Sequence, residues 1–284
     1  MTPMRSRSAS TFVLAGLLAS APMSAPSPAP PETDAPARAP LATSSGCPVF
    51  PPAAAFVDRI DNRYMPLIPG SIYIYRGSED GEEQRTVVEV TGETKTILGV
   101  EAVVVRDTVT DRRGQPIEIT LDWFAQDDRG NVWYLGEDSK EYENGQVVST
   151  EGSWEAGVNG AQPGIVMEAF PRAGDAYSQE CAPGVAEDAA RVLKLKHAVK
   201  TPFGRFSHAL LTRETTALEP GVAEEKSYAP CVGLVRAVTV KGGKGVSSLV
   251  AVQNAPSRTE LGCQQSGKHK PKHKQHRHRH GHGH

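Results

Sequence analysis

The stretch PIEITLDWFAQDDRGNVWYLGED, residues 116–138, decides the fold class. Apolar and polar side chains alternate in its first half, with Ile117, Ile119, Leu121 and Trp123 against Glu118, Thr120 and Asp122. Successive side chains of a strand point to opposite faces, so this period of two predicts a strand with its apolar face packed and its polar face wet. The turn-forming residues QDDRGN at 126–131 then predict a hairpin into a second strand.

The same pattern continues along the chain. Turn signals recur at 78–83, 111–116, 143–146 and 241–245, and the predicted strands are 71–76, 84–92, 96–108, 116–125, 131–136, 139–143, 146–151, 191–200, 205–216, 224–229, 232–241 and 246–253. Helical spacing is confined to a turn or two near Val185–Val192. Such short connections cannot make parallel crossovers, so we expect an all-β protein. Its antiparallel meander could curl into a barrel, half-barrel or sandwich, and of these we favour a barrel or half-barrel. The Gly- and Pro-rich segment 152–183 is expected to form one long irregular loop.

Composition divides the chain into four parts. Arg5 and Arg7 followed by an apolar run at 11–21 predict a signal peptide over 1–25. Residues 26–46 are rich in Pro and Ala and are expected to form a disordered linker. A single β domain is predicted over 47–265, followed by a His-, Lys- and Arg-rich disordered tail at 266–284. We therefore expect a secreted protein, extracellular or periplasmic, and a monomer.

Four cysteines, Cys47, Cys181, Cys231 and Cys263, occur without a Cys-x-x-Cys spacing. An even number in an exported chain predicts disulfides. Three connectivities are open. We favour Cys181–Cys231 within the domain and Cys47–Cys263 between its ends, because the termini of a compact domain often lie close together.

The tail at 268–284 contains Lys, Arg and His but no acid, while the whole chain has a formal charge of −2. An acidic body with a basic tail does not indicate nucleic-acid binding. The alternating imidazoles of the tail predict modest affinity for Zn, Ni or Cu and contact with an anionic polymer or membrane surface; the alternative is a solubilising tail. These metal candidates are His276, His278, His280, His282 and His284. No cofactor is expected to be required.

Two further histidines flank a Pro-Phe-Gly turn in KHAVKTPFGRFSH, residues 196–208. In a regular hairpin centred on Pro202-Phe203, His197 would face His208 with Cβ atoms about 4.5–5.5 Å apart. The pair could bind a metal, act in acid–base catalysis or form a neutral hydrogen-bonded pair in a partly polar interior. In each case protonation would oppose like charges, which predicts lower stability in mild acid.

Acidic side chains cluster around the opening hairpin, where Asp122 and Glu137 lie near Trp123. A carboxylate pair flanked by aromatic residues is typical of glycoside hydrolases, whereas an acidic turn is also simply a soluble one. Calcium coordination by Asp127, Asp128 and Asn131 is a weaker alternative, because their spacing does not match an EF-hand loop.

An aromatic anchor, Trp154, is followed by Glu155 within the Gly-rich segment 152–183. It could close over a pocket, or it could plug one end of the barrel. The predicted ligand-binding residues are thus Trp154, Glu155, Trp123, Asp122 and Glu137. No Gly-x-Ser-x-Gly, His-Glu-x-x-His or phosphate-binding loop occurs in the sequence, which removes the commonest enzyme classes.

Three runs of the sequence, 121–138, 151–165 (EGSWEAGVNGAQPGI) and 228–235 (YAPCVGLV), resemble an uncharacterised family of exported bacterial proteins. The resemblance covers about Phe50 to Val252 and implies an all-β exported domain without an assigned activity. More distantly, PRAGDAY at 171–177 and the 228–235 run are similar to lipoprotein-carrier half-barrels, which bind apolar ligands in a concave sheet.

These observations favour a secreted or envelope-associated binding protein, non-enzymatic, with a small apolar or cell-envelope ligand. The alternative is a carboxylate- or metal-dependent hydrolase that acts on an extracellular polymer. A carrier needs a largely apolar cavity, whereas an enzyme needs polar groups that converge in a cleft. Asp122 and Glu137 on the outer face of the sheet would exclude the hydrolase.

Overall fold

The computed structural model describes residues 46–256. The predicted signal peptide, the linker up to residue 45, Cys263 and the whole His-rich tail lie outside the described residues. The first half of the domain contains η1 (Ala53–Ala55), β1 (Phe56–Val57), β2 (Ile60–Asp61), β3 (Pro66–Leu67), β4 (Ile72–Glu79), β5 (Glu82–Ile97), β6 (Val100–Asp111), β7 (Pro116–Asp127), β8 (Val132–Glu143) and β9 (Gln146–Ser149). The second half contains β10 (Trp154–Glu155), β11 (Gln162–Met167), β12 (Ala176–Ser178), β13 (Glu180–Cys181), β14 (Asp188–Lys200), β15 (Arg205–Thr216), β16 (Ala223–Ala229), β17 (Gly233–Lys241) and β18 (Gly245–Gln253).

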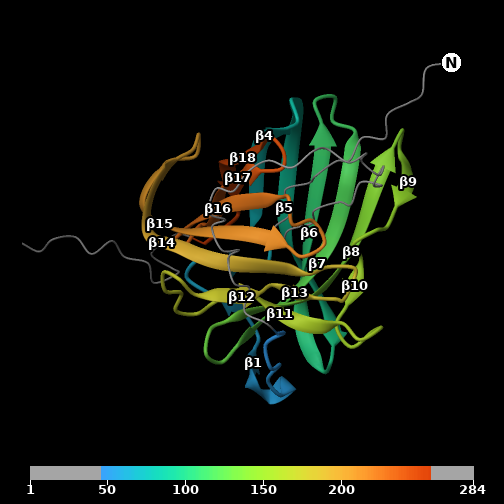
Figure 1. The fold of residues 1–284 in the computed structure, drawn as a ribbon, viewed down its shortest axis with the longest axis vertical. Helices are drawn as coiled ribbons and strands as arrows, with labels where there is room; N and C mark the ends of the chain where they lie inside the picture. The colour runs from blue at the N-terminus through green and yellow to red at the C-terminus, as the bar shows by residue number, and fades with distance from the viewer. Residues whose placement is uncertain (1–45, 257–284) are drawn as a thin grey trace, which may run out of the picture.

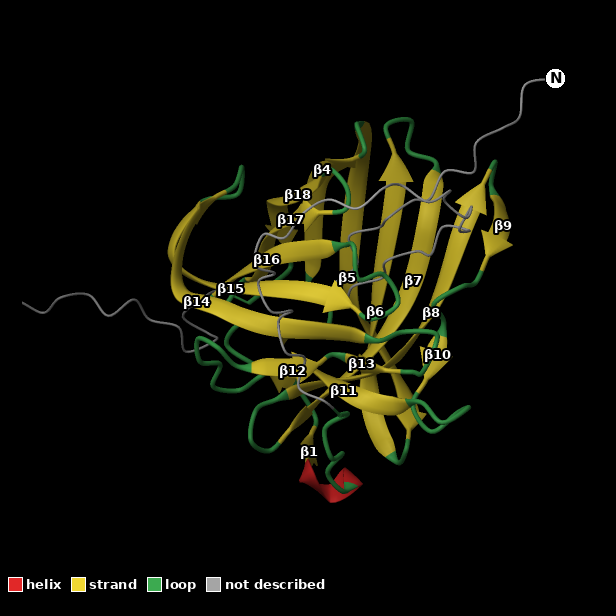
Figure 2. Cartoon of the chain, viewed as in Figure 1, coloured by secondary structure: helices red, strands yellow, loops and turns green. Residues whose placement is uncertain are grey.

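One antiparallel sheet forms almost the whole molecule. Its strand order is β12-β14-β15-β16-β17-β18-β4-β5-β6-β7-β8-β11-β13. The long strands β5–β8 form one wall, and β14–β16 run across them in front (Figure 1; Figure 2). The end strands β12 and β13 are separated in sequence only by Gln179, so the sheet is a nearly closed barrel. The predicted all-β barrel of antiparallel strands is confirmed.

Several predicted element boundaries are wrong. The predicted strand 96–108 is split by a tight turn, because Leu98 and Gly99 adopt positive φ. The predicted strands 131–136 and 139–143 are one continuous strand, β8. The segment 152–183 is not wholly irregular, since it contains β10–β13. Near 185–192 the chain enters β14 rather than a helical turn, and η1 is the one helical element within 46–256. No helix in this described part is long and apolar enough to cross a membrane.

The inward and outward faces of β7 are the reverse of the prediction. Glu118, Thr120 and Asp122 are buried, while Ile117 and Ile119 are only half-buried. The neighbouring strands continue the pattern, so that a belt of polar side chains lies inside the barrel. The apolar core fills the rest of the interior and includes Phe124, Tyr134, Leu135, Met167, Leu210 and Leu249.

The disulfide pattern is also different from the prediction. Cys47 is bonded to Cys181, so both predicted pairings, Cys181–Cys231 and Cys47–Cys263, are wrong. Cys231 is likewise disulfide-bonded. The Cys47–Cys181 bond ties the start of the domain to β13, the last strand of the sheet order.

Candidate functional site

A cavity of about 350 Å³ lies between β8, β10 and the turn that follows β13. Trp123, Glu137, Trp154 and Glu155 line it, so four of the five predicted ligand-binding residues are brought together. The fifth, Asp122, lies directly opposite Glu137 in the β7–β8 pairing. The other lining residues are Asp138, Ser153, Val158, Asn159, Ala161, Ala182, Pro183 and Val185.

The close approach of β10 to β8 positions the aromatic wall of the cavity. Trp154 pairs with Glu137 and Glu155 pairs with Gly136. Gly136 has φ of +134°, and a Cβ at this position would lie 2.3 Å from the carbonyl oxygen of Trp154. Only glycine allows this contact. Trp154 then packs edge-on against Tyr134, with ring centroids 5.4 Å apart, and is buried rather than exposed at the barrel end.

Tyr134 joins the two predicted carboxyl groups. Its hydroxyl lies 2.6 Å from Asp122 Oδ1 and 3.0 Å from Glu137 Oε2. A phenol carries one proton, so it can donate to one carboxylate and accept a hydrogen bond from the other only if that other group is protonated. Burial raises the pKa of Asp122 to about 7 and raises the pKa of Glu137 well above its usual range. The contacts with Tyr134 and the raised pKa of both groups therefore favour a proton on the pair.

The remaining oxygens of this pair have no partner. Asp122 Oδ2 and Glu137 Oε1 are buried without a hydrogen-bond partner among the described residues, as are both carboxyl oxygens of Glu180. Burial, and then the proximity of Asp188 and Glu137, raises the pKa of Glu180. Because buried polar atoms are normally hydrogen-bonded, the orphaned Oε1 of Glu137, the one of these groups that lines the cavity, indicates a place for a donor.

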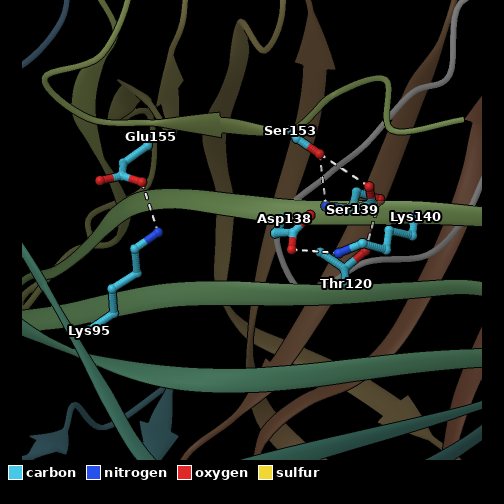
Figure 3. A network of polar contacts seen from close by, with 7 residues as sticks. All are labelled: Lys95, Thr120, Asp138, Ser139, Lys140, Ser153 and Glu155. Carbon is cyan, nitrogen blue, oxygen red and sulfur yellow. Dashed lines mark hydrogen bonds and ion pairs between the residues drawn. The ribbon is translucent and has the colours of Figure 1, made fainter.

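An ammonium group already lies at the rim of the cavity. Lys95 Nζ is 3.3 Å from the centroid of the Trp123 ring and 2.8 Å from Glu155 Oε2. In Figure 3 the two side chains reach toward each other from β5 and β10. Figure 3 also shows two separate contacts: Lys140 Nζ lies 2.5 Å from Asp138 Oδ2, and the backbone N–H of Ser139 donates a hydrogen bond to Ser153 Oγ. The Trp123 face and Glu155 thus form a cation–π and ion-pair site.

The Asp122–Glu137 pair belongs to the larger belt of polar side chains in the barrel interior. Lys226, which has no exposed surface, forms ion pairs with Glu214 at 2.7 Å and Glu224 at 3.4 Å. Burial alone would lower its pKa, but these carboxylates outweigh burial and raise it. Lys226 is the one buried Lys or Arg within residues 46–256, and the buried acids there include Asp107, Glu118, Asp122, Glu137, Glu180, Asp188 and Glu214. The interior therefore carries excess acid.

Four polar residues of the barrel interior were not predicted from the sequence: Tyr134, Glu180, Asp188 and Lys226. Strand alternation gave no signal for Tyr134, because it would place a residue three positions before Glu137 on the opposite face. The register shift in the β7–β8 pairing brings the Tyr134 hydroxyl to that side chain. For Lys226 the signal was its place in AEEKSYA, where alternation puts it on the same face as Tyr228 and opposite to Glu225. No local signal marks Glu180, because β13 is only two residues long.

The predicted facing of His197 and His208 is wrong. The β14–β15 hairpin begins in the predicted register, with Lys200 opposite Arg205, but shifts between His197 and Val199 so that His197 faces Ala209. His208 is exposed and its Nδ1 contacts Ser207 Oγ at 2.8 Å. In the described part of the chain no three His, Cys, Asp or Glu side chains are placed to hold a metal ion.

The other acids of the opening hairpin have a structural role. Asp127 accepts hydrogen bonds from the backbone N–H groups of Arg129 and Asn131, from Asn131 Nδ2 and from Trp133 Nε1. These donors occupy its carboxylate and close the turn, so the calcium alternative at Asp127 has no support in the geometry. Asp127 and Trp133 also lie apart from the cavity-lining set.

Two solved structures are similar to this chain. A candidate exported protein with a YmcC-like fold from Bacteroides fragilis has 17% identity and a TM-score of 0.42, and covers 68% of this chain and 99% of its own. A candidate lipoprotein from Parabacteroides distasonis has 13% identity and a TM-score of 0.40, with the same coverage. No family model matches the chain, and no curated protein matches it in sequence.

Proposed function

We propose that this protein is an exported binding protein, secreted or envelope-associated, that holds a small molecule in the cavity between Trp123 and Trp154. The observation that carries the proposal is the convergence of two indole rings and a buried, unsatisfied carboxyl group, Glu137, on one cavity. Small-molecule sites are typically cavities of about 300–1,000 Å³ with aromatic walls and a few polar groups that fix orientation. Export is supported by the signal-peptide pattern at 1–25 and by the Cys47–Cys181 disulfide.

A carboxylate-dependent hydrolase is the second candidate. It is favoured by the Asp122–Glu137 pair, which faces the interior and holds one proton, as an acid catalyst requires. Asp122 has no exposed surface and does not line the cavity, so only Glu137 can reach a ligand. A hydrolase needs both carboxyl groups at the substrate, and this asymmetry favours binding over hydrolysis.

Tryptophan fluorescence tests the binding function directly. A Trp133→Phe background leaves Trp123 and Trp154, both in the cavity, as the only tryptophans of the chain. We expect at least one of 2-phenylethanol, 2-phenylethylamine and methyl β-glucoside to change their emission saturably. Ala161→Phe, which fills the cavity, should abolish the response, whereas Val147→Phe on the exposed strand β9 should retain it.

Two results would contradict the proposal. The first is the absence of a saturable response to all three probes. The second is a response that Ala161→Phe leaves unchanged, because the probe would then bind elsewhere. Release of reducing sugar from a polysaccharide that is lost in both Asp122→Asn and Glu137→Gln would instead support the hydrolase.

A further inference from the structure

The charge around the cavity is of one sign. Glu137, Asp138 and Glu155 line it, and no Lys, Arg or His is among the lining residues. Asp138 is neutralised by Lys140, and Glu155 by Lys95. Glu137 is the lining acid that has no cation beside it. A ligand that brings a positive charge would therefore complete the floor of the cavity.

The chain's own lysine shows which cation the rim accepts. The ammonium of Lys95 stacks on Trp123 and pairs with Glu155 at once. A free amine would find the same combination of aromatic face and carboxylate deeper in the cavity, where Trp154 and Glu137 lie next to each other. Glu137 is 1% exposed, and its Oε1 has no partner among the described residues. An N–H donor fits this atom, whereas a quaternary ammonium has no N–H to offer.

We propose that the cavity binds a small aromatic or alkyl primary ammonium compound, whose N–H groups replace the proton held between Asp122 and Glu137. This inference rests on the proposed binding function. On binding, the ammonium donates to Glu137 Oε1, the carboxyl proton of the pair leaves to solvent, and the Tyr134 hydroxyl remains to donate to Asp122 or Glu137. The pair then carries two negative charges against the ligand's positive charge, so that binding releases a proton.

Other titratable groups around Glu137 set the background for this exchange. Glu118 and Asp188 add negative charge, Glu180 lies near the Tyr134 hydroxyl, and Lys226 provides the opposing positive charge to Asp122. The titratable groups around Glu137 are Asp122, Tyr134, Glu118, Glu180, Asp188, Lys226, Asp138, Glu155 and Lys95. All except Lys226 and Lys95 are acids or a phenol, so the surroundings favour a cation over an anion.

Isothermal titration of the full chain with two matched probes tests the proposal. 2-Phenylethylamine carries an ammonium, and 2-phenylethanol is its neutral analogue of similar size. We expect the amine to bind about tenfold more tightly or better, since hydrogen bonds to charged groups are the stronger ones. In two buffers of different ionisation enthalpy the amine should release a proton and the alcohol none. The affinity for the amine should fall as the pH is lowered from about 8 to 5.5, because protons compete for the same pair.

Two variants locate the effect. Glu137→Gln keeps the shape of the protonated acid and should bring the two probes to similar affinity without weakening the alcohol. Glu225→Gln is the matched control, because that carboxylate is paired with Arg213 and does not line the cavity, and it should preserve the preference. Lys95→Met does not touch the pair. It frees the Trp123 face and Glu155, and should raise the affinity for the amine about threefold while leaving the affinity for the alcohol unchanged.

The outcomes separate this proposal from the broader one. If the alcohol binds as tightly as the amine, or no proton is released, the ammonium proposal is wrong while the binding function stands. An amine affinity that Lys95→Met leaves unchanged or weakens also overturns it. If neither probe binds and methyl β-glucoside does not bind either, the binding function fails as well.

Discussion

Asp122 and Glu137 face each other across β7 and β8 and share the hydroxyl of Tyr134. The pair is satisfied only when one carboxyl group is protonated, because the single phenolic hydrogen cannot be donated to both. Phe124 stacks on the Tyr134 ring with a centroid distance of 4.7 Å and holds it in place. A proton is thereby built into the interior of the barrel at the floor of the cavity.

Removal of the Tyr134 hydroxyl is expected to destabilise the protein. Tyr134→Phe leaves Asp122 Oδ1 and Glu137 Oε2 without this partner in a buried site. The loss should be about 1–3 kcal/mol of unfolding free energy, measured by urea denaturation. Tyr142→Phe, on the same strand but only half-buried, is the control and should change little. A Tyr134→Phe protein as stable as the control would show that the hydroxyl does not hold the pair together.

The stability of the protein is expected to fall as the pH rises from about 5 to 7.5. Burial raises the pKa of Asp122 and Asp188 from 3.8 to about 7 and that of Glu224 from 4.5 to about 7. The folded protein therefore binds these protons more tightly than the unfolded chain, and unfolding releases them between about pH 4 and 7. Each such group lowers the unfolding free energy by ~1.4 kcal/mol per pH unit inside this window. Urea midpoints measured across it provide the test.

This sign is opposite to the one that the histidine pair predicted. His197 and His208 do not face each other, and the pKa of His197 is lowered by burial and by Lys194, in a half-buried side chain. Asp122→Asn should flatten the pH dependence, whereas His197→Gln should leave it unchanged. Midpoints that rise between pH 5 and 7.5 would show that the buried acids are ionised in the folded state.

The period of the strands could be predicted from the sequence, but not which face of them is buried. The alternation of β7 is visible in the sequence, where Ile117 and Ile119 alternate with Glu118 and Thr120. The expectation that the apolar face is the buried one then places the wrong face inside. This expectation fails because other strands supply partners that alternation cannot show. Thr120 bonds to Glu118 and to Ser139 of β8, and the positive charge of Lys226 lies near the belt. Burial of polar side chains depends on such long-range partners.

Part of the geometry around the cavity could be predicted from the sequence. Trp123 and Glu137 are on adjacent strands of one hairpin, so their proximity follows from local sequence. The position of Trp154 depends on Gly136, and its register could not be known in advance. The histidine register failed for a similar local reason, since the β14–β15 pairing shifts between Val199 and His197, where two residues of β15 stand opposite one of β14. The pairing of Cys47 with Cys181 follows from closure of the sheet, which no local pattern encodes.

Loss of the buried ammonium of Lys226 is expected to be severe. Lys226→Met keeps the length of the side chain but leaves Glu214 and Glu224 without their cation. Removing one partner of a buried ion pair typically costs about 3–5 kcal/mol. Lys200→Met, at an exposed end of β14, is the control. Because the uncompensated acids can take up protons, the Lys226→Met defect should be smaller at pH 5 than at pH 8. An equal defect at both values would contradict this interpretation.

The Cys47–Cys181 disulfide is expected to stabilise the barrel by closing a loop that spans 134 residues. The chain-entropy estimate for a loop of this length is about 4–5 kcal/mol, reduced by any strain in the folded state. The double variant Cys47→Ser, Cys181→Ser should lower the urea midpoint under oxidising conditions. Peptide mapping without reduction should recover the two cysteines in one linked pair. Recovery of a Cys181–Cys231 peptide would contradict the structure.

Substitution of Gly136 is expected to open the cavity. A methyl group at this position would lie 2.3 Å from the carbonyl oxygen of Trp154 and 2.9 Å from the Cα of Glu155, both backbone atoms, and the φ of +134° is itself strained for alanine. Gly136→Ala must therefore push β10 away from β8, and Trp154 moves with it. We expect a red-shifted tryptophan emission in the Trp133→Phe background, loss of probe binding and a stability loss of about 2–4 kcal/mol. Gly145→Ala, also at positive φ but with no atom near the added methyl, is the matched control. It also places alanine at a positive φ and lacks the contact, so a similar loss of binding in both variants would show that the approach of β10 to Gly136 does not form the cavity wall.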